Sequence, residues 1–172
     1  MSNKLILWSF IIVPWLTLFL MKKEEIRRYF PVGIFAALTS IVIVDIGSTL
    51  HLWTLKDNIY PLGKVFPYHL GAIPVVTMWL FKFTFPNFLM YLSVDALYNL
   101  LFAFVITPWM AARGIRENIN STNSLLFVIV TLHGILLFGY QILQEGIPLR
   151  LSNLGLQTAA AKLRFKDKAK NN

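Results

Sequence analysis

The sequence predicts an all-α fold, a polytopic membrane helical bundle with about five transmembrane helices. Composition is the first indication, because 56% of the residues are hydrophobic and 14% are charged, against about 25% charged in a soluble domain. The second is a series of apolar stretches close to the ~20 residues that a helix needs to cross a ~30 Å hydrocarbon core. The third is the position of the basic residues, which gather beside these stretches.

The helices are expected at five places in the chain. They are residues 5–21, 31–53, 67–85, 86–109 and 124–143. With their loops they form one transmembrane domain over residues 1–148, and a basic cytoplasmic tail follows over residues 149–172. Because the tail is poor in apolar residues, we expect either disorder or a surface helix near anionic lipid.

The first span is short, and Pro14 is expected to kink it. The sequence KKEE that follows it does not resemble the small-residue site at which a signal peptide is cleaved, which favours a retained helix. Residues 22–30 are expected to form a charged connector with a short surface helix, in which Glu24 and Arg28 are four residues apart. The second span would then begin at Pro31.

Asp45 lies within the second span. Ser48 and Thr49 follow it on the same side of the helix, so that their hydroxyls can hydrogen-bond the carboxylate. Residues 54–66 are expected to form a loop. The third span contains Pro74, which is expected to kink it near its middle.

The fourth span carries a polar stripe. Its members share one side of the helix and are Asn87, Tyr91, Asp95, Tyr98 and Asn99. Lipid offers no partner for a carboxylate, so we expect this side to face other helices or a wet cavity. Asp95 is then either a packing acid held by a neighbouring hydroxyl or amide, or a functional acid.

The ends of the fourth span are marked by prolines. Pro86 suits the first turn of a helix, and Pro108 with Trp109 is expected to close the far end. The fifth span follows a polar loop at residues 110–123, in which Ser121, Thr122 or Asn123 is available to cap the helix. His133 lies within the fifth span.

The distribution of basic residues predicts the orientation of the chain. With five spans, eleven of the 16 Lys and Arg residues fall on one side of the membrane. The other side holds Lys4, Lys56, Lys64, Arg113 and Arg116. The positive-inside rule therefore predicts a cytoplasmic tail and an amino terminus outside.

Three ionisable groups are expected at similar depth. Measured from the cytoplasmic ends of the expected spans, Asp45 lies ~20 Å, Asp95 ~14 Å and His133 ~16 Å into the membrane. If the helices are adjacent, these groups could relay protons, bind a cation or hold a metal. They do not form a recognised metal-ligand spacing, and we expect neither a metal nor a cofactor.

Several functions are excluded by what the sequence lacks. The absence of cysteine excludes disulfides, thiolate zinc sites and cysteine nucleophiles. The chain contains no GxGxxG, P-loop, HExxH or GxSxG motif. The net charge of +8 follows from basic residues beside the spans, so no nucleic-acid partner is expected.

The stretches KKEEIRRYFPVGIFAAL, IVIVDIGSTLHLW and PYHLGAIPVVTMWLFKFTFPNF together resemble an uncharacterised family of small multi-pass membrane proteins from endospore-forming Gram-positive bacteria. The resemblance covers roughly residues 22–110 and follows the sequence pattern, without a catalytic motif. It implies a protein of the bacterial plasma membrane or the spore inner membrane. The family carries no assigned activity, so no functional residue is transferred.

These observations favour a non-enzymatic integral membrane protein, alone in the bilayer or as a homo-oligomer. The expected site comprises Asp45, Asp95 and His133, with Tyr91, Tyr98 and Asn99 on the same polar stripe as Asp95. It would bind or pass a proton, a cation or a small polar solute. Two alternatives remain open: a structural or assembly subunit of a larger membrane complex, and a membrane-embedded enzyme that acts on a lipid or isoprenoid.

Overall fold

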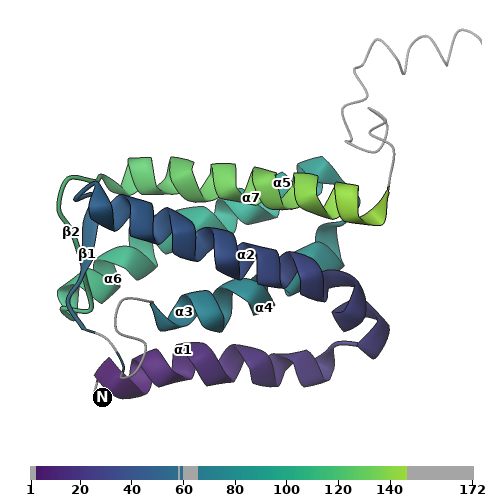
Figure 1. Cartoon of the computed structure of the whole chain (residues 1–172), viewed down its shortest axis with the longest axis horizontal. Helices are drawn as coiled ribbons and strands as arrows, with labels where there is room; N and C mark the ends of the chain where they lie inside the picture. Colours follow the sequence, from purple (N-terminus) through teal and green to yellow (C-terminus); the bar gives the residue numbers. More distant parts are fainter. Residues whose placement is uncertain (1–2, 58, 60–65, 147–172) are drawn as a thin grey trace, which may run out of the picture.

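The computed structural model describes residues 3–57, 59 and 66–146 as a bundle of helices with a small two-stranded sheet at one end (Figure 1). The elements in order are α1 (Asn3–Thr17), η1 (Leu18–Leu20), α2 (Lys23–Thr49), β1 (Trp53–Leu55), α3 (Pro67–Leu70), α4 (Ala72–Thr84), α5 (Phe88–Leu101), η2 (Phe102–Ile106), α6 (Thr107–Ala112), β2 (Arg116–Asn118) and α7 (Asn123–Glu145). The predicted all-α class is confirmed. The predicted basic tail lies outside the described residues, as does most of residues 58–65.

Four helical segments of the described chain are long and apolar enough to cross a membrane. They are Asn3–Leu20, Lys23–Thr49, Phe88–Ala112 and Asn123–Glu145. Large apolar side chains point outward from these segments, and Phe19, Leu97 and Leu143 are among the most exposed. Such surfaces suit lipid and not water, which indicates a membrane location. The remaining apolar helix α4 has only 13 residues, so the predicted number of five spans stays a prediction.

The second helix begins earlier than the sequence suggested. We expected a charged connector at residues 22–30 and a span starting at Pro31, but α2 runs without a break from Lys23 for 27 residues, and Pro31 lies inside it. The Glu25 carboxylate accepts a hydrogen bond from the backbone N–H of Lys22 at 3.1 Å and caps the helix start. Arg28 pairs with Glu145 of α7 and not with Glu24.

The second helix also ends earlier than expected. The predicted span 31–53 stops at Thr49, and Trp53 begins strand β1. Strands β1 and β2 pair antiparallel, with Leu55 opposite Arg116. Both predicted loops, residues 54–66 and 110–123, therefore contribute to one sheet, a pairing between distant segments that local sequence does not reveal.

The break in the third predicted span falls at Gly71 and not at Pro74. Pro74 lies in the first turn of α4, where a missing N–H costs no helical hydrogen bond. Gly71 separates α3 from α4 and lies against the backbone of Phe10 and Ile11 in α1, where a methyl group would overlap the chain. The break between α3 and α4 thus falls where α1 approaches closely and where only glycine fits.

Neither proline lies where we expected it in the fourth helix, Pro86 in its first turn and Pro108 at its far end. Pro86 lies before the helix, and Asn87 is the N-cap, its side chain accepting a hydrogen bond from the Met90 N–H at 3.2 Å. Pro108 does not end the helix either, because the chain passes through the π-helical turn η2 and continues to Ala112. The wider π-helical turn lets the helix continue past Pro108, which has no backbone N–H to donate.

The start of α7 agrees with the prediction. Among the three candidate caps, Thr122 accepts a hydrogen bond from the Leu125 N–H at 3.1 Å. The helix ends at Glu145 and is followed by Gly146, whose φ of +60° is the left-handed conformation that glycine adopts readily.

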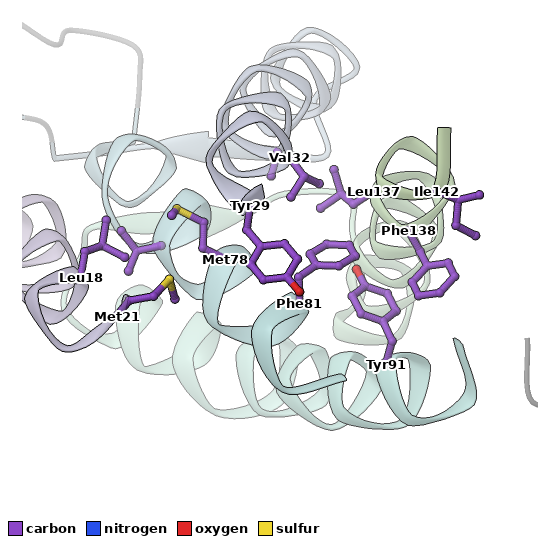
Figure 2. Close-up of a cluster of buried hydrophobic side chains, with 12 residues drawn as sticks. Leu18, Met21, Tyr29, Val32, Met78, Phe81, Tyr91, Leu137, Phe138 and Ile142 are labelled. Carbon is purple, nitrogen blue, oxygen red and sulfur yellow. The ribbon is translucent and has the colours of Figure 1, made fainter. Parts of the chain in front are cut away.

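An aromatic cluster holds four helices together. Figure 2 shows the ring of Phe81, from α4, between Tyr29 of α2 and the pair formed by Tyr91 of α5 and Phe138 of α7. The ring centroids of Phe81 and Tyr91 are 4.8 Å apart, and those of Tyr91 and Phe138 are 5.0 Å apart. Interlocking packing of this kind drives helix association where burial from water does not.

Polar contacts define the two ends of the bundle. Lys82 of α4 pairs with Glu25 of α2 at 2.9 Å, and Arg28 pairs with Glu145 at 2.5 Å, so the start of α2 and the ends of α4 and α7 lie together. At the opposite end, the Asn3 side-chain amide donates to the Arg113 carbonyl at 3.0 Å. Figure 1 shows the sheet at the same end as the amino terminus.

Candidate functional site

A cavity with a polar side lies between α4, α5 and α7. It has a volume of about 70 Å³. Its polar lining comprises Thr77, Tyr91, Asp95, Tyr98, Asn99 and His133, and the rest of the wall is apolar. The predicted stripe on α5 therefore faces the interior of the bundle, and the structure brings five of the six predicted site residues to one cavity.

Asp95 is buried, with 8% of its surface exposed. Its Oδ2 accepts a hydrogen bond from the Asn99 side-chain amide at 2.7 Å, one helical turn away. The same amide lies 3.5 Å from the Thr131 hydroxyl. No Lys or Arg pairs with Asp95 within the part of the chain that the structure describes. The carboxylate is therefore held by an amide alone and remains free to take a proton or a cation from the cavity.

Gly134 of α7 and Tyr91 of α5 shape the position of Asp95. Gly134 packs against the carboxylate so closely that a methyl group in place of its hydrogen would overlap both oxygens. The Tyr91 hydroxyl, one of the neighbouring hydroxyls expected to hold Asp95, instead donates to the Gly134 carbonyl at 2.9 Å. This bond fixes α5 against α7 at the level of the cavity.

His133 is oriented by a residue of α2. Its Nε2 lies 2.7 Å from the Thr39 hydroxyl, and that hydroxyl itself donates to the Phe35 carbonyl at 2.7 Å. Because the single hydroxyl proton is used on Phe35, the Thr39 oxygen accepts from His133. The imidazole thus carries a proton on Nε2, and its Nδ1 is the nitrogen left to accept a proton.

Asp45 does not join the cavity. It is exposed on the outside of α2 and is not among the residues that line the space around Asp95. The helix starts at Lys23, eight residues before the predicted start, and ends at Thr49, which places Asp45 only ~6 Å from the helix end. There a carboxylate can reach the interfacial region. The Thr49 hydroxyl bonds to the Asp45 backbone carbonyl at 3.0 Å.

The donor set of the cavity does not resemble a metal centre. Across residues 3–57, 59 and 66–146, no three His, Asp or Glu side chains are grouped so that they could hold a metal ion. Asp95 and His133 are the cavity's ionisable acid and base.

A second cavity, of about 60 Å³, lies toward the sheet and shares His133 with the first. Arg116, His69 and Ser40 line it, and all three are buried. Sequence analysis missed them. Arg116 was counted as a loop cation, and only its pairing through β2 carries it inside. The signal in the sequence that could have indicated this cavity was the pair of adjacent hydroxyl residues Thr39 and Ser40 within a span, since such residues often hydrogen-bond across helices.

Comparisons with known proteins found no match: no family model, no curated protein and no solved structure matches the chain.

Proposed function

We propose that this chain is a non-enzymatic integral membrane protein that takes up and releases a proton or a small cation at Asp95. The single observation that carries the proposal is a buried carboxylate that faces a cavity beside other polar side chains and is paired with an amide and not with a base. Ionisable groups inside a membrane are costly, and they commonly mark a proton or ion path.

The size of the cavity favours an ion over a larger ligand. At about 70 Å³, it holds a few water molecules at ~10–15 Å³ each. Pockets for metabolites or drug-sized ligands are several-fold larger, at about 300–1,000 Å³. The space is smaller than the pockets that hold whole substrates, which favours an ion over the lipid or isoprenoid substrate of the enzyme alternative.

His133 is the second functional group of the proposal. Its Nε2 is held by Thr39, which leaves Nδ1 able to accept a proton, and the residue lines both cavities. An imidazole in this position can pass a proton between Asp95 and the sheet end of the bundle. Asn99 then acts as the partner that holds the Asp95 carboxylate in place.

We propose five spans with the amino terminus outside and the carboxyl end of α7 in the cytoplasm. The pairing of β1 with β2 supports this count, because it returns the chain to the same end of the bundle. The segment from α3 to α4 must then cross in one direction and α5 to α6 in the other. The bias of basic residues supports the orientation. The resemblance noted above supports a bacterial plasma membrane or spore inner membrane.

Ion flux into vesicles that contain the purified protein tests the proposal. Proton, Na⁺ and K⁺ flux would be measured for wild type, Asp95→Asn and Asp45→Asn. We expect Asp95→Asn to lower the flux about tenfold or more, because an amide neither takes a proton nor balances a cation. Asp45→Asn is the matched control, since the same chemical change falls on an exposed acid.

Three results would contradict the proposal. One is the absence of proton and cation flux in wild type under a pH or ion gradient. Another is flux in Asp95→Asn equal to that of wild type, which would make Asp95 a packing acid. The third is an equal loss of flux in both variants, which would assign the effect to membrane electrostatics and not to the cavity.

A further inference from the structure

The second cavity contains a buried arginine with part of its hydrogen-bonding capacity unused. Arg116, on β2, has 2% of its surface exposed. Its guanidinium lies over the Trp53 ring, 4.9 Å from the centroid. Nε and Nη2 have no hydrogen-bond partner among the described residues. These two nitrogens form one edge of the guanidinium, the edge that binds two oxygens of a planar or tetrahedral oxyanion at once.

The charge of Arg116 is also uncompensated by the described chain. The neighbouring Glu117 points away and pairs with Lys56 at 2.7 Å. Glu25 and Glu145 pair with cations at the other end of the bundle. Burial lowers the pKa of Arg116, and the nearby Tyr68 hydroxyl partly offsets this, but arginine keeps its proton in proteins. A buried cation of this kind calls for a counter-charge.

A second polar atom faces the same space. His69 has 2% of its surface exposed, and its Nδ1 lies 2.8 Å from the Ser40 hydroxyl. That hydroxyl donates to the Ala37 carbonyl at 2.8 Å, so it accepts from His69. The other imidazole nitrogen, Nε2, is buried and unpartnered within the described chain. A cavity of about 60 Å³ thus receives two unused donors from Arg116 and one unused acceptor from His69, because the neutral imidazole carries its proton on Nδ1.

We propose that this cavity binds a small oxyanion, a carboxylate or a phosphate group, through the Nε and Nη2 edge of Arg116. His69 Nε2, which carries no proton in this tautomer, is the second polar contact and accepts a hydrogen bond from the hydroxyl of a hydrogen phosphate group or from a water bound to a carboxylate. Trp53 forms the wall behind the guanidinium. The volume accommodates a group of a few heavy atoms and not a whole metabolite. The proposal is independent of the cation site at Asp95, because it uses different residues and the opposite charge.

Direct binding tests the proposal. Radiolabelled acetate and inorganic phosphate would be equilibrated with the full chain, purified in a detergent without phosphate groups. We expect saturable binding of at least one probe to wild type and about tenfold or more weaker binding to Arg116→Lys, which keeps the charge but loses the two-nitrogen edge. Arg113→Lys is the matched control, because Arg113 also lies 4.9 Å from a tryptophan ring but is exposed. It should bind as wild type does.

Competition separates the two sources of such a group. Displacement of the bound probe by short-chain phosphatidylglycerol would assign a lipid headgroup, and retention of the probe would assign a free anion. Either result supports the site. No saturable binding of acetate or phosphate to wild type, or equal binding to wild type and Arg116→Lys, would overturn it.

A spectroscopic measurement covers the case in which Arg116→Lys does not fold. With ¹⁵N-labelled arginine, acetate or phosphate should shift the Nε resonance of one arginine in the wild-type protein, since the anion contacts that atom. Unchanged arginine resonances at saturating probe would overturn the proposal. Failure of this test leaves the flux at Asp95 unaffected, and failure of the flux test leaves anion binding unaffected.

Discussion

The carboxylate of Asp95, on α5, packs directly against the backbone of Gly134 on α7. No side chain other than hydrogen leaves room for the carboxylate there, so the glycine determines where the acid lies. The Tyr91 hydroxyl closes the same contact by donating to the Gly134 carbonyl at 2.9 Å. The position of the Asp95 carboxylate is therefore set by the packing of α5 against α7 and by the glycine at position 134.

Replacement of Gly134 by alanine should move Asp95 and destabilise the protein. Because the added methyl group overlaps the carboxylate, we expect a loss of about 1–3 kcal/mol, the usual cost of overpacking. Flux through the cavity should fall as well. Unfolding of the purified protein in mixed micelles and flux in vesicles measure the two effects.

Gly139→Ala is the control on the same helix. No atom lies within 4 Å of the position that its methyl group would occupy. Alanine favours a helix over glycine by up to about 1 kcal/mol, so this variant should be as stable as wild type or more so. A Gly134→Ala protein as stable as the Gly139→Ala protein would contradict the packing of Asp95 against α7.

Replacement of Thr39 by valine should destabilise the protein through His133. The variant keeps the shape of the side chain but removes the acceptor of the His133 Nε2–H. A donor left without a partner inside a protein costs about 1–3 kcal/mol. Thr39→Ser keeps the hydroxyl and should cost less. Chemical unfolding compares the two, and ¹⁵N spectra of labelled histidine report whether Nε2 still carries the proton.

An unchanged Nε2 protonation state in Thr39→Val, with stability equal to that of Thr39→Ser, would show that another group holds the imidazole. The prediction would then be wrong, and the orientation of His133 would have to come from α7 itself.

The interior-facing stripe on α5 was predictable because a carboxylate within an apolar span has few acceptable positions. Periodicity placed Tyr91, Asp95, Tyr98 and Asn99 on one side, and the structure places all four on the cavity. His133 was reached by a depth argument alone. Asp45 failed the same argument because its helix starts eight residues earlier than the proline suggested, and depth says nothing about which side of a helix faces inward.

The second cavity was not predictable because it depends on a long-range pairing. Strands β1 and β2 are three residues each, too short to leave a period-two pattern. Without that pairing, Arg116 is an ordinary loop cation. The breaks at Gly71 and η2 were not predictable for a similar reason. The first lies where α1 approaches, and the second lies just before Pro108. Neither interrupts the apolar character of the sequence.

Loss of the charge on Glu145 should loosen the end of the bundle at which α2 begins and α7 ends. Its carboxylate accepts two hydrogen bonds from Arg28, both at 2.5 Å, and one from Gln141 at 2.7 Å. We expect Glu145→Gln to cost about 1 kcal/mol, above an ordinary surface pair because the contact is bidentate. A double-mutant cycle with Arg28→Gln measures the coupling, and a coupling near zero would contradict the prediction.

Accessibility of single cysteines should decide whether the segment from α3 to α4 crosses the membrane. The chain has no cysteine, so each introduced thiol reports without background. With five spans and the amino terminus outside, Asn120→Cys should react with an impermeant maleimide in intact cells, as should Lys56→Cys. Glu24→Cys should react only after permeabilisation. All three positions are exposed in the structure.

Labelling at Asn120→Cys distinguishes the two topologies, because Asn120 follows α3 and α4 in the chain. If that segment dipped into the bilayer without crossing, α5 and α6 would deliver Asn120 to the cytoplasmic side while Lys56 stayed outside. The two thiols would then label on opposite sides. The pairing of Leu55 with Arg116 does not permit that outcome, because two strands of one sheet cannot face opposite aqueous compartments. Opposite labelling would therefore contradict both the five-span count and the sheet that encloses Arg116.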